Sequence, residues 1–216
     1  MSHFKSFITF YVPYLIFLIT LLVLILFYDK AELHLKLSSF HTPNLDLFFK
    51  NFTEIGGSFP YLVIVVMLFF RYKVALFLFI TQVASGLFSK FIKQMFNAPR
   101  PIKYFAENFP DIQLYHVPGV ELHTNYSLPS GHTITAFAFF LSLAFYTQRK
   151  DLHFVYFVCA ALVGFSRIYL SQHFALDVLV GAMVGVAVTV SWKFYYDDFS
   201  STWSDGSVLN LFTKKK

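Results

Sequence analysis

Three short groups of polar residues in this chain have the side chains needed to bind and transfer a phosphate group. They are Lys93 with Arg100-Pro101, the tetrapeptide Pro129-Ser130-Gly131-His132, and Ser166-Arg167 followed by His173 and Asp177. Lys and Arg bind phosphate oxygens, whereas a histidine with a carboxylate partner can act as a nucleophile. Apolar stretches long enough to cross a bilayer separate the groups. The sequence therefore predicts three loops at helix ends that meet at one membrane surface.

The composition of the chain suits lipid better than water. Of its 216 residues, 56% are hydrophobic, 21% aromatic and only 13% charged, whereas a soluble domain has about 25% charged residues. A spanning helix needs about 20 mostly apolar residues, and six segments qualify. They are Phe7–Tyr28, Ser58–Phe70 (extended back to near Glu54), Val74–Phe91, Thr133–Tyr146, Leu152–Leu170 and Ala175–Tyr195. We expect an all-α, polytopic membrane protein that forms one domain, residues 1–216, with a cytoplasmic tail at 197–216.

The charges that flank the predicted spans indicate their orientation. With the N-terminus in the cytoplasm, that side carries Lys5, Arg71, Lys73, Arg149, Lys150, Lys193 and Lys214–Lys216 against Asp151, Asp197, Asp198 and Asp205. Cytoplasmic loops have an excess of Lys and Arg, so we expect both termini inside. The loops after the third and fifth spans then share the outer side, where all three polar groups lie. This topology explains the net charge of +5, and no nucleic-acid partner is expected.

Lys93 and Arg100 lie just beyond the third predicted span. If the helix continues that far, their spacing places both side chains on one face, and Pro101 then helps to end the helix. Arg offers phosphate a planar fork of donors, and Lys a mobile point charge. We interpret Lys90 and Lys103 as ordinary flanking cations.

The tetrapeptide 129–132 opens the fourth predicted span. Ser130 can cap the helix, and the first amides of a helix are free to donate hydrogen bonds to an anion. Gly131 leaves room for a phosphate to approach, and His132 can give a proton to a leaving oxygen. A plain capped helix start with an interfacial histidine has the same sequence, so this motif alone is a weak signal.

His173 and Asp177 are spaced to share one face of a helix. The acid can bind one ring nitrogen of the histidine and leave the other free as a nucleophile. A structural His–Asp cap is the alternative, but Arg167 at the same predicted membrane face favours a catalytic pair. The sequence has no HExxH motif, cysteine cluster or pair of carboxylates suited to a divalent ion, so we expect neither a metal nor a cofactor.

Other segments have structural interpretations. The segment between the first two spans is predicted to lie at the membrane interface, with Thr42 or Asn44 capping a short helix. The loop 97–127 is the longest polar stretch, and its aromatic side chains are expected at headgroup level. Gly181 and Gly185 form a small-xxx-small step that favours close approach of two helices.

Taken together, the three groups resemble the signature of the type 2 phosphatidic acid phosphatase (PAP2) family. They read Lys-x6-Arg-Pro at 93–101, Pro-Ser-Gly-His at 129–132 and Ser-Arg-x5-His-x3-Asp at 166–177, with every signature position present. The stretch Thr42–Gly57 is also similar to the segment before that family's second span. The resemblance covers about residues 42–192, and it implies a six-helix membrane bundle with its active site at the outer, periplasmic face.

The resemblance also implies an activity. The chain is expected to be a metal-independent lipid phosphate phosphatase that acts through a phosphohistidine. Its compactness and the outward-facing site indicate a bacterial inner membrane. His173 is then the nucleophile, Asp177 its orienting partner and His132 the general acid. The residues implied to hold the phosphate are Lys93, Arg100, Ser130, Gly131 and Arg167. Undecaprenyl pyrophosphate, phosphatidylglycerol phosphate, phosphatidic acid and phosphorylated lipid A all fit as substrates, and the oligomeric state is open.

Three other classes of protein compete with this interpretation. A lipid phosphotransferase would use the same phosphohistidine but pass the phosphoryl group to another lipid, so it would release no free phosphate without an acceptor. A vanadate-dependent haloperoxidase resembles the same signature, but those enzymes are soluble and larger. A flippase or lipid-binding protein without activity would not need Asp177. The phosphatase interpretation is favoured.

Overall fold

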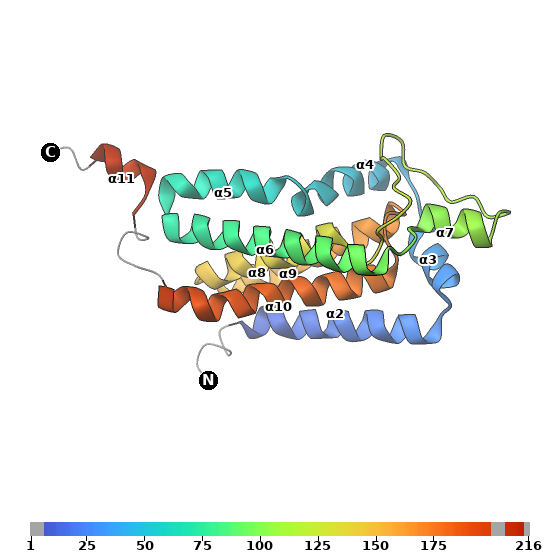
Figure 1. Cartoon of the computed structure of the whole chain (residues 1–216), viewed down its shortest axis with the longest axis horizontal. Helices are drawn as coiled ribbons and strands as arrows, with labels where there is room; N and C mark the ends of the chain where they lie inside the picture. Colours follow the sequence, from blue (N-terminus) through green and yellow to red (C-terminus); the bar gives the residue numbers. More distant parts are fainter. Residues whose placement is uncertain (1–6, 200–205, 214–216) are drawn as a thin grey trace.

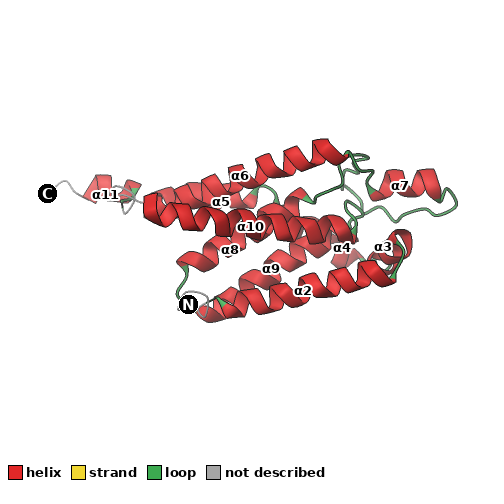
Figure 2. Cartoon of the chain, turned by 60° about the horizontal axis from the view of Figure 1, so that its bottom comes forward, coloured by secondary structure: helices red, strands yellow, loops and turns green. Residues whose placement is uncertain are grey.

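The computed structural model describes residues 7–199 and 206–213, and within them it is helical with no strand (Figure 2). The helices that run along the long axis of the molecule (Figure 1) are α2 (Ile8–Phe27), α5 (Phe59–Phe70), α6 (Tyr72–Phe96), α8 (Gly131–Tyr146), α9 (Lys150–Tyr169) and α10 (Ala175–Phe199). Shorter helices, α3 (Lys30–Ser38), α4 (Pro43–Phe52) and α7 (Pro101–Asn108), gather at one end. The 3₁₀ helix η1 (Thr53–Gly56) follows α4, and α11 (Val208–Thr213) lies at the opposite end of the bundle. The all-α prediction is confirmed.

The lengths of the described helices bear on the number of spans. Four stretches are long and apolar enough to cross a bilayer: Ile8–Phe27, Tyr72–Asn108, Lys150–Tyr169 and Ala175–Tyr196. A fifth is added if Pro43–Gly56 and Phe59–Phe70, which are bent by 50° relative to each other, form one broken span. Helix α8 is apolar but has only 16 residues. The six-span count therefore stays a prediction.

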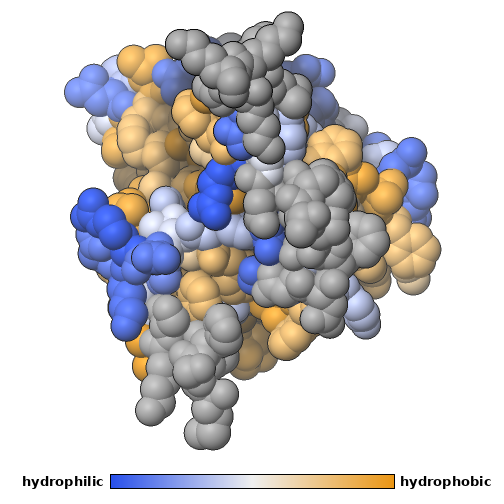
Figure 3. Space-filling model, turned by 90° about the vertical axis from the view of Figure 1, so that its left-hand side faces the viewer, coloured by the Kyte–Doolittle hydropathy of each residue, from blue (hydrophilic) through white to orange (hydrophobic). Residues whose placement is uncertain are grey.

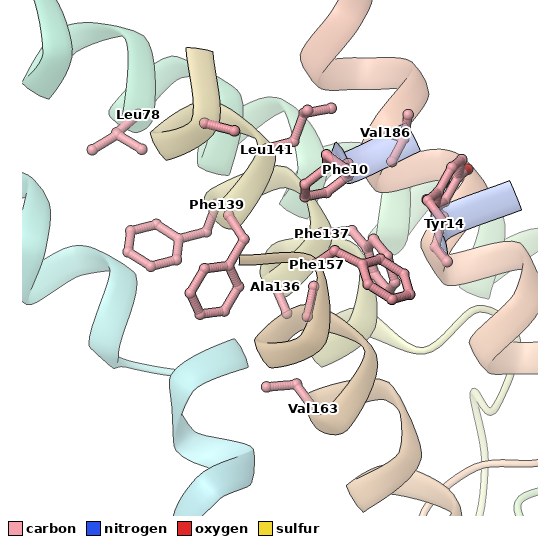
Figure 4. Packing of buried hydrophobic residues seen from close by; sticks show 14 of the residues in the cluster. Phe10, Tyr14, Leu78, Ala136, Phe137, Phe139, Leu141, Phe157, Val163 and Val186 are labelled. Atoms are coloured by element: carbon pink, nitrogen blue, oxygen red, sulfur yellow. The ribbon is translucent and has the colours of Figure 1, made fainter. Parts of the chain in front are cut away.

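Helix α8 lies at the centre of the bundle, with buried side chains on every face. Phe137 packs against Tyr14 and Phe17 of α2, with ring centroids 5.7 and 5.8 Å apart. Figure 4 shows Phe137 and Phe139 among side chains from the neighbouring helices. A helix that is hydrophobic all round is stable only when it is enclosed. The enclosure fixes the start of α8, which carries the Pro-Ser-Gly-His motif.

Gly181 and Gly185 lie where α10 packs against α8. A β-carbon on Gly185 would come within 2.5 Å of the carbonyl oxygen of Ile134, and one on Gly181 within 2.9 Å of that of Ser130. The predicted close approach of two helices at this step is therefore confirmed. It brings the first turns of α8 and α10 together.

Two expectations about the segment after α6 are wrong. Helix α6 ends at Phe96, since Asn97 adopts a left-handed conformation (φ 39°, ψ 39°), and α7 then begins at Pro101, inside the stretch expected to be a loop. Arg100 is the N-cap of α7 and does not share a helical face with Lys93. The physical reason is that proline suits the first position of a helix, where its missing N–H costs nothing, so Pro101 starts a helix.

The segment between α2 and α5 forms α3, α4 and η1. Of the two predicted caps, Thr42 is the one used: it precedes α4, and its side-chain oxygen accepts a hydrogen bond from the Leu45 amide at 3.3 Å.

Part of the predicted tail is described, and it contacts the bundle. Helix α10 continues to Phe199, and the Gly206 carbonyl accepts a hydrogen bond from the Tyr72 amide at 2.9 Å. Figure 3 looks onto this end, where hydrophilic surface lies beside hydrophobic surface. The remainder of the predicted tail, 200–205 and 214–216, lies outside the described residues, as does Lys5, so part of the charge count used for orientation is not tested.

We predict that Gly185→Ala destabilises the bundle, because the added methyl group would overlap with the Ile134 carbonyl oxygen. Overpacking of this kind costs about 1–3 kcal/mol, so the melting temperature of the detergent-purified protein should fall. Gly86→Ala in α6 is the matched control, since in the described structure nothing lies within 4 Å of its added β-carbon. Equal melting temperatures for the two variants would contradict the role given to Gly185.

Candidate active site

The three predicted groups meet at the end of the bundle that carries α3 and α7 (Figure 1). The Ser130 amide donates a hydrogen bond to the Asp177 carbonyl oxygen at 3.0 Å, which joins the start of α8 to the start of α10. The Lys93 ammonium from α6 lies 3.8 Å from the point where a β-carbon on Gly131 would lie. Residues far apart in the sequence therefore form one site.

Arg100 is held in the site by backbone and amide oxygens. Its Nε donates to the Asn125 carbonyl oxygen at 3.0 Å, and its Nη1 donates to Gln172 Oε1 at 2.9 Å. The Arg100 amide also donates to the Thr124 carbonyl oxygen at 2.8 Å. Because Gln172 directly precedes His173, these bonds connect the loop before α8 to the turn that carries the histidine.

A tight turn between α9 and α10 places His173. Ser171 adopts a left-handed conformation (φ 51°), and the amides of Gln172 and His173 both donate to the Arg167 carbonyl oxygen, at 2.9 and 3.0 Å. This pattern is typical of a helix that ends with a left-handed residue. His173 thus precedes α10, and the expectation that it shares a helical face with Asp177 is wrong.

Asp177 reaches back from the first turn of α10. Its Oδ2 accepts hydrogen bonds from the Phe174 amide at 2.9 Å and from Ser127 Oγ at 2.5 Å, and lies 3.4 Å from His173 Nδ1. An acid that returns to an amide at the start of its own helix acts as a cap. The pair therefore exists, through a cap and not through helical spacing. Asp177 favours the tautomer with the proton on Nδ1, which leaves Nε2 free.

His173 is almost completely buried, with 1% of its surface exposed. Burial lowers the pKa of its imidazole from the ordinary 6.5 to about 3, while Asp177 acts in the opposite direction. Loss of hydration disfavours the charged form. The ring is therefore neutral at physiological pH, which is the nucleophilic form.

Arg167 is buried beside the histidine turn. Its Nη1 donates to Thr53 Oγ1 at 2.8 Å, and its Nε is buried with no hydrogen-bond partner among the described residues. A buried cation with an unpaired donor is unfavourable unless an anion binds to it. The Arg167 guanidinium can therefore donate a hydrogen bond from Nε to an oxyanion.

The prediction that Ser130 caps the helix at the start of α8 is confirmed. Ser130 is the N-cap, and its Oγ accepts hydrogen bonds from the Thr133 amide at 3.4 Å and from Thr133 Oγ1 at 2.8 Å. A β-carbon on Gly131 would lie 3.4 Å from Ser89 Oγ, so the backbone is closely approached here. His132 follows in the first turn. It lines the same cavity as Lys93 and Arg100.

A cavity of about 790 Å³ opens at this site. Its lining residues are Gly56, Gly86, Ser89, Lys90, Lys93, Gln94, Arg100, His123, Thr124, Asn125, Tyr126, Gly131, His132 and Thr135. None of these described residues is acidic, so the cavity favours an anion. Lys90 contributes to it, whereas Lys103 donates to Asn125 Oδ1 at 3.0 Å outside the lining. His173 and Arg167 are buried and do not form part of the lining.

Sequence reasoning missed the contribution of η1. Thr53 holds Arg167, the Gly56 carbonyl accepts a hydrogen bond from Thr135 Oγ1, and a β-carbon on Gly56 would lie 2.5 Å from the His132 carbonyl oxygen. The Gly56-Gly57 pair before a predicted span was the available signal, because adjacent glycines allow a close backbone approach. Ser127 and Gln172 carried no comparable signal.

The chain is similar to known proteins of one family. The model of the family described as the PAP2 superfamily matches residues 73–200. Lipid A 1-phosphatase of Rhizobium johnstonii is 31% identical over 110 residues, which are 50% of this chain and 42% of that protein. Dihydrosphingosine 1-phosphate phosphatase of Schizosaccharomyces pombe is 28% identical over 200 residues, 86% of this chain and 47% of that protein. The chain spans less than half the length of these two relatives.

Two solved structures are similar to most of this chain. The crystal structure of Aquifex aeolicus LpxE has a TM-score of 0.68 and 27% identity, and the match covers 78% of this chain and 97% of that one. A transmembrane PAP2-type phosphatidylglycerolphosphate phosphatase from Bacillus subtilis has a TM-score of 0.63 and 24% identity, over 91% and 98% of the two chains. The second likeness concerns the fold alone.

We predict that Thr53→Val weakens binding of an oxyanion, because Arg167 loses the hydroxyl that holds it. A hydrogen bond to a charged group is worth about 1.5–3 kcal/mol, so affinity for orthovanadate, measured by calorimetry in detergent, should fall about tenfold or more. Thr53→Ser retains the hydroxyl and should bind like the parent. If Thr53→Val also binds like the parent, the bond does not position Arg167.

Proposed function

The chain belongs to the PAP2 superfamily, and we propose that it is an integral-membrane phosphatase that removes phosphate from a lipid through a phosphohistidine intermediate. The observation that carries this proposal is the neutral, buried His173 with Asp177 3.4 Å from its Nδ1, beside the unpaired donor of Arg167. A nucleophile with an orienting acid and a vacant cationic donor is the arrangement needed for attack on a phosphate.

Anion binding is the first part of the proposed mechanism. The residues assigned to the phosphate oxygens are Lys93, Arg100, Ser130, Gly131 and Arg167. The two arginines are held by neighbouring oxygens. At the start of α8 the Ser130 and Thr133 amides already donate, to the Asp177 carbonyl oxygen and to Ser130 Oγ, so the amides assigned to the phosphate are those of Gly131 and His132. Fixed donors of this kind stabilise charge that develops in the transition state without having to reorganise.

Covalent transfer follows. Nε2 of His173 attacks phosphorus, the bond from phosphorus to the lipid oxygen breaks, and His132 gives a proton to that oxygen. Asp177 stabilises the positive charge of the resulting phosphohistidine. Water then attacks phosphorus and gives a proton to His132, and cleavage of the P–N bond restores His173 and releases phosphate.

The substrate class rests on relatives with different substrates. Besides the two phosphatases above, undecaprenyl-diphosphatase BcrC of Bacillus subtilis is 27% identical over 150 residues, 66% of this chain and 71% of that protein. The names of all three indicate phosphate on a lipid or long-chain molecule. We therefore propose a phosphomonoester or diphosphate of a lipid as the substrate.

The proposed topology has six spans in a bacterial inner membrane, with both termini cytoplasmic and the site periplasmic. Helix α8 and the broken α4–η1–α5 segment supply the spans beyond the four long ones. Arg71 lies between α5 and α6, and Arg149 lies between α8 and α9, with Lys150 at the start of α9. Both connections lie at the end of the bundle opposite to the site (Figure 1). Basic loops favour the cytoplasmic side.

We predict that the purified protein releases phosphate from at least one lipid in a panel of undecaprenyl pyrophosphate, phosphatidylglycerol phosphate, phosphatidic acid and lipid A. Release should persist in EDTA, since within the described residues no group of three His, Cys, Asp or Glu is placed to hold a metal ion. His173→Ala should abolish it. Release only after addition of an acceptor lipid would favour a phosphotransferase, and loss of release in EDTA would contradict the metal-free mechanism.

A further inference from the structure

The turn after η1 brings a carboxylate close to His132. A β-carbon on Gly57 would lie 3.1 Å from Glu54 Oε2 and 3.2 Å from His132 Nε2. The two polar atoms therefore face the same point, which glycine leaves free of any side chain. No motif in the sequence pairs these residues, because Glu54 precedes the second predicted span and His132 opens the fourth.

His132 needs a negative partner to act as an acid. The charged groups that line the cavity with it, Lys90, Lys93 and Arg100, are all positive. Positive neighbours disfavour an imidazolium, and only the protonated ring can give a proton to a leaving oxygen. A bound phosphate neutralises part of the positive charge of the cations that bind it, but its negative charge is divided among several of them.

Asp177 and Glu54 differ in their availability. The Asp177 Oδ2 already accepts hydrogen bonds from Ser127 and from the Phe174 amide and faces His173. The Glu54 carboxylate has one long hydrogen bond, from Ser58 Oγ at 3.5 Å, and is exposed. Glu54 thus has fewer hydrogen-bond partners than Asp177, and it lies near the proposed general acid.

We propose that Glu54 is a positioning residue that supplies the countercharge for protonated His132. This inference rests on the proposed phosphatase function and adds a residue to it. While phosphate occupies the cationic donors, the carboxylate holds the proton on His132 until the lipid oxygen takes it. Water returns a proton to the ring in the second step, and Glu54 stays ionised throughout.

The leaving group decides how much this device matters. A lipid alcohol leaves as a strongly basic alkoxide and needs a proton in the transition state, whereas p-nitrophenol leaves as a stable anion and does not. General acid catalysis contributes about 10²- to 10⁴-fold. Removing its countercharge should therefore slow turnover of the lipid substrate and spare the nitrophenyl ester.

The test compares Glu54→Gln with the parent on the panel lipid that the parent hydrolyses fastest and on p-nitrophenyl phosphate. We expect kcat for the lipid to fall by about tenfold or more, with kcat for p-nitrophenyl phosphate close to that of the parent. Glu54→Asp, which keeps the charge, should recover part of the loss. Glu107→Gln is the matched control, because Glu107 is an exposed acid on α7 whose nearest cation, Lys103, lies 3.8 Å away, and it should change neither rate.

An equal loss on both substrates would show that Glu54 has a structural role, and no loss on either would show that it has none, so each result overturns the proposal. Absence of phosphate release by the parent from every lipid of the panel would instead contradict the proposed function, and the role of Glu54 with it.

Discussion

The site depends on the hydrogen bonds that Asp177 accepts. One oxygen, Oδ2, accepts hydrogen bonds from Ser127 Oγ and the Phe174 amide and faces His173, while the backbone carbonyl of the same residue accepts from Ser130. The loop before α8, the start of α8, the turn after α9 and the start of α10 thus share one residue. Since a buried carboxylate is stable only when its oxygens are satisfied, these contacts fix one another, and the histidine is oriented as a consequence.

The packing of the helices brings the starts of α8 and α10 together. Helix α8 is enclosed by apolar side chains (Figure 4), and Gly181 and Gly185 let α10 approach its backbone closely. Two helix starts are thereby brought side by side, where free amides and the positive ends of helix dipoles favour an anion. The charged residues of the site lie at the end of the bundle that carries α3 and α7, so they do not interrupt the apolar packing of the helices. The packing of α10 against α8 thus forms both the core of the bundle and the base of the site.

The sequence predicted what is local and missed what is distant. Apolar runs located the long helices, and Ser130 was recognisable as a cap because a capping side chain bonds within its own first turn. The hydrogen bond from Arg167 to Thr53 joins residues 114 positions apart, and no periodicity reports such a contact. Pro101 was ambiguous, since proline both ends one helix and starts another. The pairing of His173 with Asp177 was expected for the wrong reason, because His173 precedes α10, which begins at Ala175, and Asp177 reaches it as a cap.

The central claim is that His173 carries the phosphoryl group during turnover. The most direct measurement is to mix the purified protein with a ³²P-labelled lipid substrate, stop the reaction in alkali, which preserves phosphohistidine, and locate the label by peptide mass spectrometry. The account predicts label on the peptide that contains His173, at that residue and in amounts comparable to the enzyme. Label on a different residue, or single-turnover release of phosphate with no labelled protein at any time, would contradict it.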